Sequence, residues 1–314
     1  MAPSKRRSLL PVGRHVRHPQ KKPAQRGPAR KLLWPAIVAL AALGAFLIAK
    51  QQAQGPSEAV APPAAGLPNT PDYHSLLVDP SDPQRVILGT HAGLYETVDG
   101  GRSWVAAELP GQDAMNLART PGKTVWAAGH ELLAKSEDGG ETWATARPAG
   151  LPGLDVHGFA AHPGDPNRLY AAIAGEGLYG SADGGNSFEL VSSEVGPGVF
   201  GLALTPQGRI MAADPGRGLL LSDDGGNTWR VAFEGSVLGV AVRPGDPATV
   251  LATGPGILRS TDGGGSWRQV LAIEKGAGPV AWAPGDPSIA YVVGFDRTLY
   301  RTDDGGATWS AVGR

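Results

Sequence analysis

The chain contains no cysteine among its 314 residues, so it forms no disulfide bond and carries no lipid on a cysteine side chain. Acidic residues are missing from its first 57 positions, because Glu58 is the first of them. Aromatic residues make up only 6% of the sequence and charged residues only 18%. Long apolar runs are equally scarce, and a single stretch is long enough to cross a bilayer.

That stretch, residues 32–49, contains 18 residues without a charge. Ten Lys or Arg residues precede it in residues 1–31, and Lys50 follows directly. Basic flanking segments stay on the cytoplasmic side of a membrane. We therefore expect residues 1–31 to form a disordered basic tail in the cytoplasm and residues 32–50 to form a single transmembrane signal-anchor helix. The remainder of the chain is then extracytoplasmic at the cell membrane.

A cleaved signal peptide is the alternative to this anchor. Its best cleavage site is Ala59-Val60-Ala61, but Pro62 directly after that site disfavours cleavage. Residues 51–71 mix proline and glycine with alanine and glutamine, and we predict that they are a spacer.

The two parts of the chain carry opposite charge. Lys and Arg up to residue 50 contribute +11, and residues 58–314 carry −12. An acidic domain disfavours nucleic acid as its ligand. The basic tail lacks aromatic residues between its charges, so membrane topology explains its charge better than nucleic-acid binding does. We expect no nucleic-acid partner.

One octapeptide recurs six times in the second part of the chain. Its clearest copy is Ser-Asp-Asp-Gly-Gly-Asn-Thr-Trp at Ser222–Trp229, and the third residues of successive copies lie 39, 45, 41, 38 and 42 residues apart. A period near 40 is typical of radial β-repeats. These third residues are Asp99, Asp138, Asp183, Asp224, Asp262 and Asp304, and the closing aromatic residues are Trp104, Trp143, Phe188, Trp229, Trp267 and Trp309.

Each repeat offers four short segments rich in branched and aromatic residues. In the fourth repeat these are residues 199–206, 209–213, 218–222 and 228–233, separated by Gly, Pro and Asp. A second recurring turn, Pro-Gly-Asp-Pro or Pro-Ser-Asp-Pro, joins the first two segments in four repeats. The pattern predicts an all-β fold in which residues 72–314 form a six-bladed β-propeller of four-stranded blades. Every blade can be built from consecutive residues, so closure of the ring needs no strand exchange.

The octapeptide resembles the Asp box, or bacterial neuraminidase repeat, S-x-D-G-G-x-T-W. This repeat occurs in sialidases, in other glycan hydrolases, in sortilin-type receptors and in the photosystem II assembly-factor family, and the resemblance covers about residues 72–314. It implies that the six Asp boxes are structural turns on the face opposite the binding site. A calcium loop is excluded, because the 12-residue spacing and its closing Glu are missing.

The opposite face of the propeller is the expected ligand-binding face. Counting back eight residues from each box Asp gives equivalent loop positions, which we expect to bring His91, His130 and Asp296 side by side. The first segments of two blades begin at His74 and His157. The predicted binding face contains His74, His91, His130, Glu131, His157, Arg217, Asp296 and Arg297. The alternative is that these loops are merely polar. We expect no cofactor and no metal, because distances between blades are expected to be too long for shared ligation.

Two functions fit these residues. The first is a non-catalytic module that binds a protein, a peptide or a glycan, in the manner of an assembly factor or scaffold. The second is a sialidase-like glycoside hydrolase, which needs two carboxylates about 5–9.5 Å apart. Asp113 and Asp214 could contribute, and the candidate catalytic residues are Asp155, Glu176 and Asp296. The Arg-Ile-Pro signature and the Tyr–Glu pair of sialidases are absent, which favours the binding module.

Overall fold

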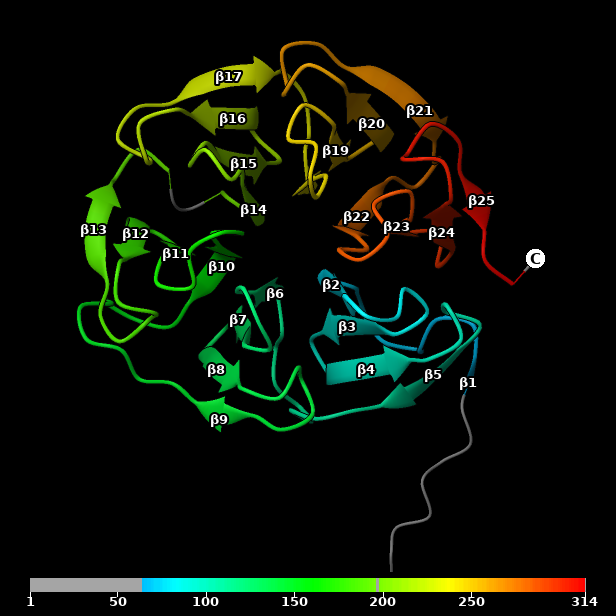
Figure 1. The fold of residues 1–314 in the computed structure, drawn as a ribbon, viewed down its shortest axis with the longest axis horizontal. Coiled ribbons are helices and arrows are strands. Elements are labelled where there is room, and N and C mark those ends of the chain that lie inside the picture. The colour runs from blue at the N-terminus through cyan, green and yellow to red at the C-terminus, as the bar shows by residue number, and fades with distance from the viewer. Residues whose placement is uncertain (1–63, 196–197, 314) are drawn as a thin grey trace, which may run out of the picture. The chain divides into compact units, whose positions relative to one another are not determined.

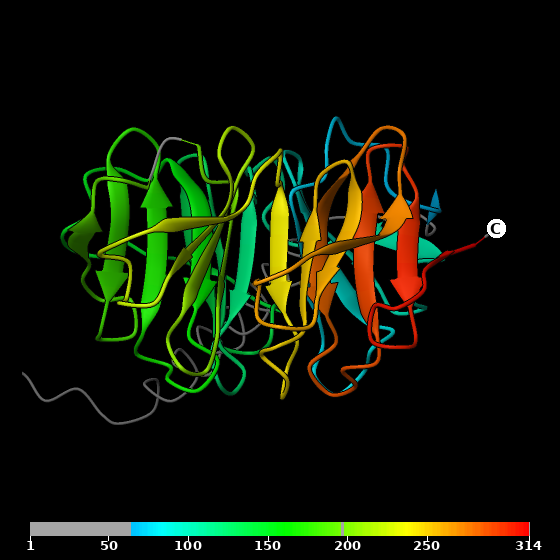
Figure 2. The same ribbon diagram turned by 90° about the horizontal axis from the view of Figure 1, so that it is seen from above.

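The computed structural model describes residues 64–195 and 198–313. They form a ring of six antiparallel β-sheets around a central axis (Figure 1). Seen edge-on, the strands run between the two faces of the ring and the connecting loops lie at those faces (Figure 2). The described part of the chain therefore forms the predicted all-β, six-bladed propeller.

Each blade is a meander of strands in chain order, with the first strand at the axis. Blade one contains β2 (Ser75–Val78), β3 (Val86–Thr90), β4 (Gly93–Thr97) and β5 (Ser103–Ala106), and blade two contains β6 (Asn116–Arg119), β7 (Val125–Gly129), β8 (Leu132–Ser136) and β9 (Ala144–Thr145). Blade three contains β10 (Val156–Ala161), β11 (Leu169–Ile173), β12 (Gly177–Ser181) and β13 (Glu189–Ser192), and blade four contains β14 (Gly201–Leu204), β15 (Ile210–Asp214), β16 (Gly218–Ser222) and β17 (Arg230–Phe233). Blade five contains β18 (Gly239–Val242), β19 (Val250–Thr253), β20 (Gly256–Ser260) and β21 (Arg268–Ala272), and blade six contains β22 (Ala277–Trp282), β23 (Ala290–Gly294), β24 (Leu299–Thr302) and β25 (Ser310–Ala311).

The ring closes where β2 of blade one contacts β22 of blade six. The last strand, β25, pairs with β24 of its own blade, so closure involves no exchanged strand, as predicted. Blade one differs from the prediction by a fifth strand: β1 (Ala64–Ala65) pairs antiparallel with the outer strand β5, with Ala64 opposite Trp104. Two residues of the predicted spacer are thus part of the sheet.

The core lies between neighbouring blades, and the aromatic residues that close the Asp boxes enter it. Trp104 of blade one is only 2% exposed and packs in one cluster with Tyr291 and Leu299 of blade six. Phe188 is equally buried between blades two and three, whereas Trp229 is only partly buried. Burial of large rings at the blade junctions joins adjacent sheets into one body.

Each Asp box is a hydrogen-bonded turn. In blade three, Asp183 accepts hydrogen bonds through Oδ1 from Ser181 Oγ at 2.8 Å and from the backbone N–H of Ser187 at 3.0 Å, and through Oδ2 from Ser187 Oγ at 2.6 Å. These bonds favour the charged carboxylate and lower its pKa to about 2. The backbone N–H of Gly184 donates to Asn167, so the box and the first turn of the blade lie on the same face. The box therefore has the structural role that the sequence predicts.

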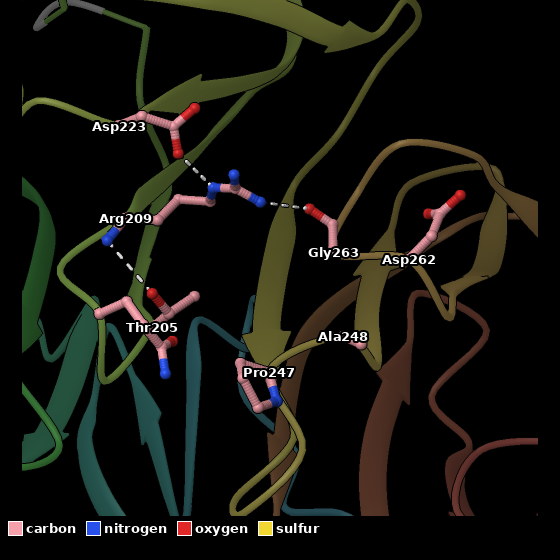
Figure 3. A pocket seen from close by; sticks show the side chains of 8 residues that line it. Thr205, Arg209, Asp223, Pro247, Ala248, Asp262 and Gly263 are labelled. Atoms are coloured by element: carbon pink, nitrogen blue, oxygen red, sulfur yellow. Dashed lines mark hydrogen bonds and ion pairs between the residues drawn. The ribbon is translucent and has the colours of Figure 1, made fainter.

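Some polar contacts on this Asp-box face join one blade to the next. Arg209 of blade four donates through Nε to Asp223 in its own box at 2.5 Å and through Nη1 to the carbonyl of Gly263 in the box of blade five at 3.1 Å (Figure 3). These residues line a pocket of about 320 Å³. Because the guanidinium group is used for these contacts, we assign the pocket to the structure of the blade junction.

The predicted basic tail, residues 1–31, and the predicted transmembrane helix, residues 32–50, lie outside the described residues. Within the described residues, no helix has the length and apolar character needed to cross a membrane.

Candidate functional site

Seven side chains of blades one, two and three form a continuous row on the face opposite the Asp boxes. We call it the histidine–aspartate row, and it consists of Asp72, His74, His91, Asp113, His130, Asp155 and His157. Five members come from the beginnings of the first strands of the three blades or from the residues just before them, and His91 and His130 come from the turns between the second and third strands of blades one and two.

The row is built by repetition of two positions. Asp72, Asp113 and Asp155 each lie eight residues before the proline of the first turn in their blade, at positions 80, 121 and 163. His91 and His130 each lie eight residues before the Asp of their box. Because equivalent positions of adjacent blades lie side by side in a propeller, repetition places like side chains next to one another.

The first group in the row is formed within blade one. His91 Nδ1 lies 2.8 Å from His74 Nε2 and 2.5 Å from Asp72 Oδ1. His74 Nε2 in turn lies 3.2 Å from the same carboxylate oxygen. Two imidazole nitrogens and one carboxylate oxygen therefore converge on one point.

An equivalent group forms across the junction of blades two and three. His130 Nε2 lies 3.1 Å from His157 Nε2 and 3.3 Å from Asp155 Oδ1. His157 Nε2 and Asp155 Oδ1 are 3.2 Å apart. The three atoms thus form a nearly equilateral triangle, and a β-bridge between His130 and Asp155 holds their backbones together.

Asp113 lies between the two groups. Its Oδ2 is 3.1 Å from His91 Nε2 and 3.2 Å from His130 Nδ1. Its side chain is only 11% exposed, and neither of its oxygens makes an aligned hydrogen bond. A buried carboxylate without an aligned hydrogen bond is costly, so the two flanking imidazoles are its main source of compensation.

Glycine allows the backbone to approach this carboxylate closely. A β-carbon on Gly129, the last residue of β7, would lie 1.8 Å from the carbonyl oxygen of Asp113. Only glycine fits there, and the next residue, His130, is thereby placed beside the Asp113 side chain.

Burial and charge act in opposite directions on His74. Desolvation lowers the pKa of His74 below its usual value, and the carboxylates of Asp72 and Asp113 raise it by a smaller amount. The lowered pKa favours the neutral form of the His74 ring near pH 7.

Several residues of the predicted face lie outside the row. Asp296 was expected beside His91 and His130, but its carboxylate accepts hydrogen bonds from the Tyr300 hydroxyl at 2.8 Å and from the backbone N–H of Thr298 at 3.0 Å. Its own turn uses the side chain locally, so the expected grouping of Asp296 with the histidines is wrong.

Both predicted arginines are used in other contacts. Arg217 donates to Asp214 at 2.7 Å, and Arg297 donates to Asn69 at 3.0 Å. Glu131 and Glu176 are exposed, and neither is a member of the row. Of the three candidate catalytic residues, Asp155 alone belongs to the row.

The row borders the mouth of the central channel. The other side of this mouth is apolar and is lined by Met115, Phe200, Leu238, Pro279 and Phe295. Phe200 and Phe295 are among the few large apolar side chains that stay exposed in the described residues. The cavity at this mouth measures only about 140 Å³, well below the roughly 300–1,000 Å³ of typical small-molecule sites.

Sequence reasoning missed Asp72 and did not connect Asp113 with the histidines. The missed signal is a repeated Asp-x-His, because Asp72 precedes His74 by two residues just as Asp155 precedes His157. The sequence also led us to expect that ligand atoms of adjacent blades lie too far apart to share a metal ion, and the structure places them closer than that. Ligand atoms of adjacent blades lie 3.1–3.3 Å apart.

Comparison with known proteins identifies the repeat. Residues 300–311 match the family model described as BNR/Asp-box repeat. This match and the six-bladed architecture confirm the predicted Asp-box β-propeller. No curated protein sequence matches the chain.

Solved structures share the fold at low sequence identity. The GH74 xyloglucanase from Xanthomonas campestris is 20% identical, with a TM-score of 0.56 over 79% of this chain, and the chain spans only 46% of that enzyme. YCF48 from Cyanidioschyzon merolae is 19% identical, with a TM-score of 0.51 over 80% of this chain and 88% of its own. YCF48 bound to a D1 peptide matches with the same identity and TM-score and is covered over 85% of its length. At these identities the likeness establishes the fold alone.

Proposed function

We propose that this chain is a membrane-anchored, extracytoplasmic β-propeller that binds a protein or peptide segment at the channel mouth bordered by the histidine–aspartate row. In this proposal the anchor is the segment 32–50, whose residues 32–49 carry no charge, and the basic tail before it stays in the cytoplasm. Binding rather than catalysis is the main role of the propeller in this proposal.

The observation that carries the proposal is the division of this mouth into two halves. One half presents hydrogen-bonding imidazoles and carboxylates, and the other presents exposed Phe200 and Phe295. Aromatic anchors beside polar groups are typical of protein interfaces. A cavity of about 140 Å³ is too small to enclose a drug-sized molecule, but it can accept one side chain of a segment that lies across the mouth.

The other end of the channel is the competing location. Its cavity measures about 480 Å³ and is lined mostly by prolines and glycines of the first turns, with Arg119 and Arg243 among them. This cavity has fewer polar side chains that could give a ligand specificity. One of them, Arg243, already donates to the carbonyl of Pro287 at 2.8 Å. We therefore favour the mouth bordered by the row.

A structural neighbour provides a precedent for a peptide ligand. One YCF48 structure contains a bound D1 peptide. The shared fold makes a peptide a reasonable class of ligand for this chain, and the chemistry of the channel mouth supports the same class.

Photo-crosslinking at single positions tests the proposal. A photoreactive phenylalanine analogue at Phe200 reports on the proposed mouth, and the same analogue at the exposed Asn227 reports on the Asp-box face. We expect the full-length chain to crosslink to a discrete protein from Phe200 and not from Asn227. Crosslinking from Asn227 alone would place the ligand on the other face.

Glycoside hydrolysis is the second candidate, because three carboxylates stand in one row. Asp113 and Asp72 both lie near His74, at 3.8 Å and 3.2 Å from its Nε2. A glycosidase needs two carboxylates about 5–9.5 Å apart, and Asp72 with Asp113 is the candidate pair. The test is hydrolysis of fluorogenic glycosides and of xyloglucan by the full-length chain. Turnover that disappears in Asp113→Asn or Asp155→Asn supports an enzyme, and its absence on all substrates argues against one.

A further inference from the structure

We propose that the histidine–aspartate row binds two divalent transition-metal ions. Asp72, His74 and His91 hold the first ion, and His130, Asp155 and His157 hold the second. Asp113 stands between them and fixes the orientation of both central imidazoles.

The second site has the spacing of a metal centre. Its three ligand atoms are separated by 3.1, 3.2 and 3.3 Å. Two ligands on one tetrahedral zinc ion, each bound at 2.0–2.1 Å, lie about 3.3 Å apart. An ion can therefore be placed equidistant from His130 Nε2, Asp155 Oδ1 and His157 Nε2 without a change in backbone.

The first site has the same composition in a tighter arrangement. The separations among Asp72 Oδ1, His74 Nε2 and His91 Nδ1 are 2.5–3.2 Å. The side chains of His91 and Asp72 are 41% and 34% exposed, so both have room to move apart when an ion enters. Two imidazoles and one carboxylate form a set that suits divalent zinc, iron, cobalt or nickel and leaves coordination positions open.

The position of Asp113 argues for two ions rather than three. A neutral imidazole coordinates a metal through one nitrogen and carries a proton on the other. His91 uses Nδ1 in the first site, and His130 uses Nε2 in the second. Their remaining nitrogens then carry protons, and both face Asp113 Oδ2, at 3.1 and 3.2 Å.

This arrangement explains the buried carboxylate. Histidine ligands commonly donate their second N–H to a carboxylate, which fixes the ring and strengthens the ligand. Asp113 can serve two ligands at once, and its Oδ2 gains the hydrogen bonds that it lacks when both rings are held by ions. The third combination, His91 with Asp113 and His130, then acts as the link between the sites and not as a third site.

The charges of the row also favour bound cations. Three carboxylates gather here, and within the described residues their ion-pair partners are all histidines. No Lys or Arg in that part of the chain offsets them. Two divalent cations supply the missing positive charge where the oxygens converge.

Zinc stoichiometry of the full-length chain tests the inference, which does not depend on the ligand proposed above. After chelation and desalting, the chain is dialysed against micromolar Zn²⁺, and bound metal is measured by elemental analysis. We expect two ions in the wild type, one in His74→Ala, one in His157→Ala and none in the double variant. Asp113→Asn should keep both sites with affinities lowered about 10- to 100-fold.

The matched control is His162→Asn, which changes a histidine of blade three outside the row. His162 Nδ1 accepts a hydrogen bond from the N–H of Gly164 at 3.1 Å, and the asparagine oxygen can replace it. This variant should bind two ions, and circular dichroism should show that all variants keep the β-fold. Absence of zinc from the wild type would overturn the proposal. Two bound ions in both His74→Ala and His157→Ala would also overturn it. Loss of one ion in Asp113→Asn, with two ions kept in both alanine variants, would overturn it as well.

Discussion

His130 and His157 are 27 residues apart in sequence and belong to different blades, yet their Nε2 atoms lie 3.1 Å apart. The junction of blades two and three brings them together, and Asp155 accompanies both. A similar contact forms within blade one, where His74 Nε2 lies 2.8 Å from His91 Nδ1. The row therefore gathers imidazoles and carboxylates of three blades at one sector of this face.

The fully buried ring of Trp104 should contribute more to stability than the partly buried ring of Trp229. Trp104→Ala removes an indole side chain that is 2% exposed. This side chain packs where blades one and six meet and the propeller closes. We expect a loss of about 3–5 kcal/mol in the free energy of unfolding. Trp229→Ala should cost about 2 kcal/mol, because less area returns to water. Denaturant unfolding measures both losses. Equal losses would contradict the claim that burial of Trp104 at the junction of blades one and six gives it the larger contribution.

Acid should weaken the fold through the Asp boxes. Hydrogen bonds lower the pKa of Asp99, Asp183, Asp224, Asp262 and Asp304 from 3.8 to about 2. The folded state therefore binds fewer protons than the unfolded state. Its stabilisation is complete above about pH 5 and is lost as the pH falls from about 4 towards 2.

The denaturation midpoint measured from pH 6 to pH 2 checks this expectation. Asp224→Asn removes one titrating box, so the variant should be less stable at pH 6 and should lose less on acidification. A wild-type midpoint that stays constant down to pH 2 would contradict the account of the boxes.

The contact between blades four and five depends on Arg209. Arg209→Ala removes the hydrogen bonds to Asp223 and to the carbonyl of Gly263 (Figure 3). Because Asp223 is exposed, we expect a modest loss of about 1 kcal/mol. Arg209→Lys should recover only part of it, because an ammonium group cannot reproduce the planar fork. Full stability of the alanine variant by denaturant unfolding would show that the contact adds nothing.

The anchor prediction concerns residues outside the described part of the chain. We expect the mature protein to retain residues 1–50 and protease added outside intact cells to reach the propeller. N-terminal sequencing of the membrane fraction and protease treatment of spheroplasts check these two points. A mature N-terminus between residues 51 and 66 would indicate a cleaved signal peptide.

The fold followed from the sequence because the repeat specifies it directly. Six boxes at a period near 40 define six blades, and the Ser or Thr, the Gly pair and the closing aromatic residue of each box have local roles that depend little on distant residues. The short strand β1 could not be foreseen, because two alanines carry no strand signal of their own. Their pairing depends on the exposed edge of β5.

The candidate site was foreseen in part. Register predicted that His74, His91, His130 and His157 lie at one channel mouth, and in the structure their rings form a row of neighbours. It failed for Asp296, because the direction of a side chain depends on the conformation of its own turn, where Tyr300 provides a nearby donor. The distances between blades could not be read from the sequence either, because they depend on close backbone contacts between blades, such as that of Gly89 with the carbonyl of Ala114.

The central claim is that the functional site lies along the histidine–aspartate row. The most direct measurement is the affinity of the partner captured at Phe200 for the double variant His91→Ala/His130→Ala. The variant takes both flanking imidazoles from the buried Asp113 carboxylate, so circular dichroism and the denaturation midpoint must first show that it remains folded. We expect its affinity to fall at least about tenfold while Asp223→Ala on the opposite face binds as the wild type does. Unchanged binding by the histidine variant, with a loss in Asp223→Ala, would contradict the account.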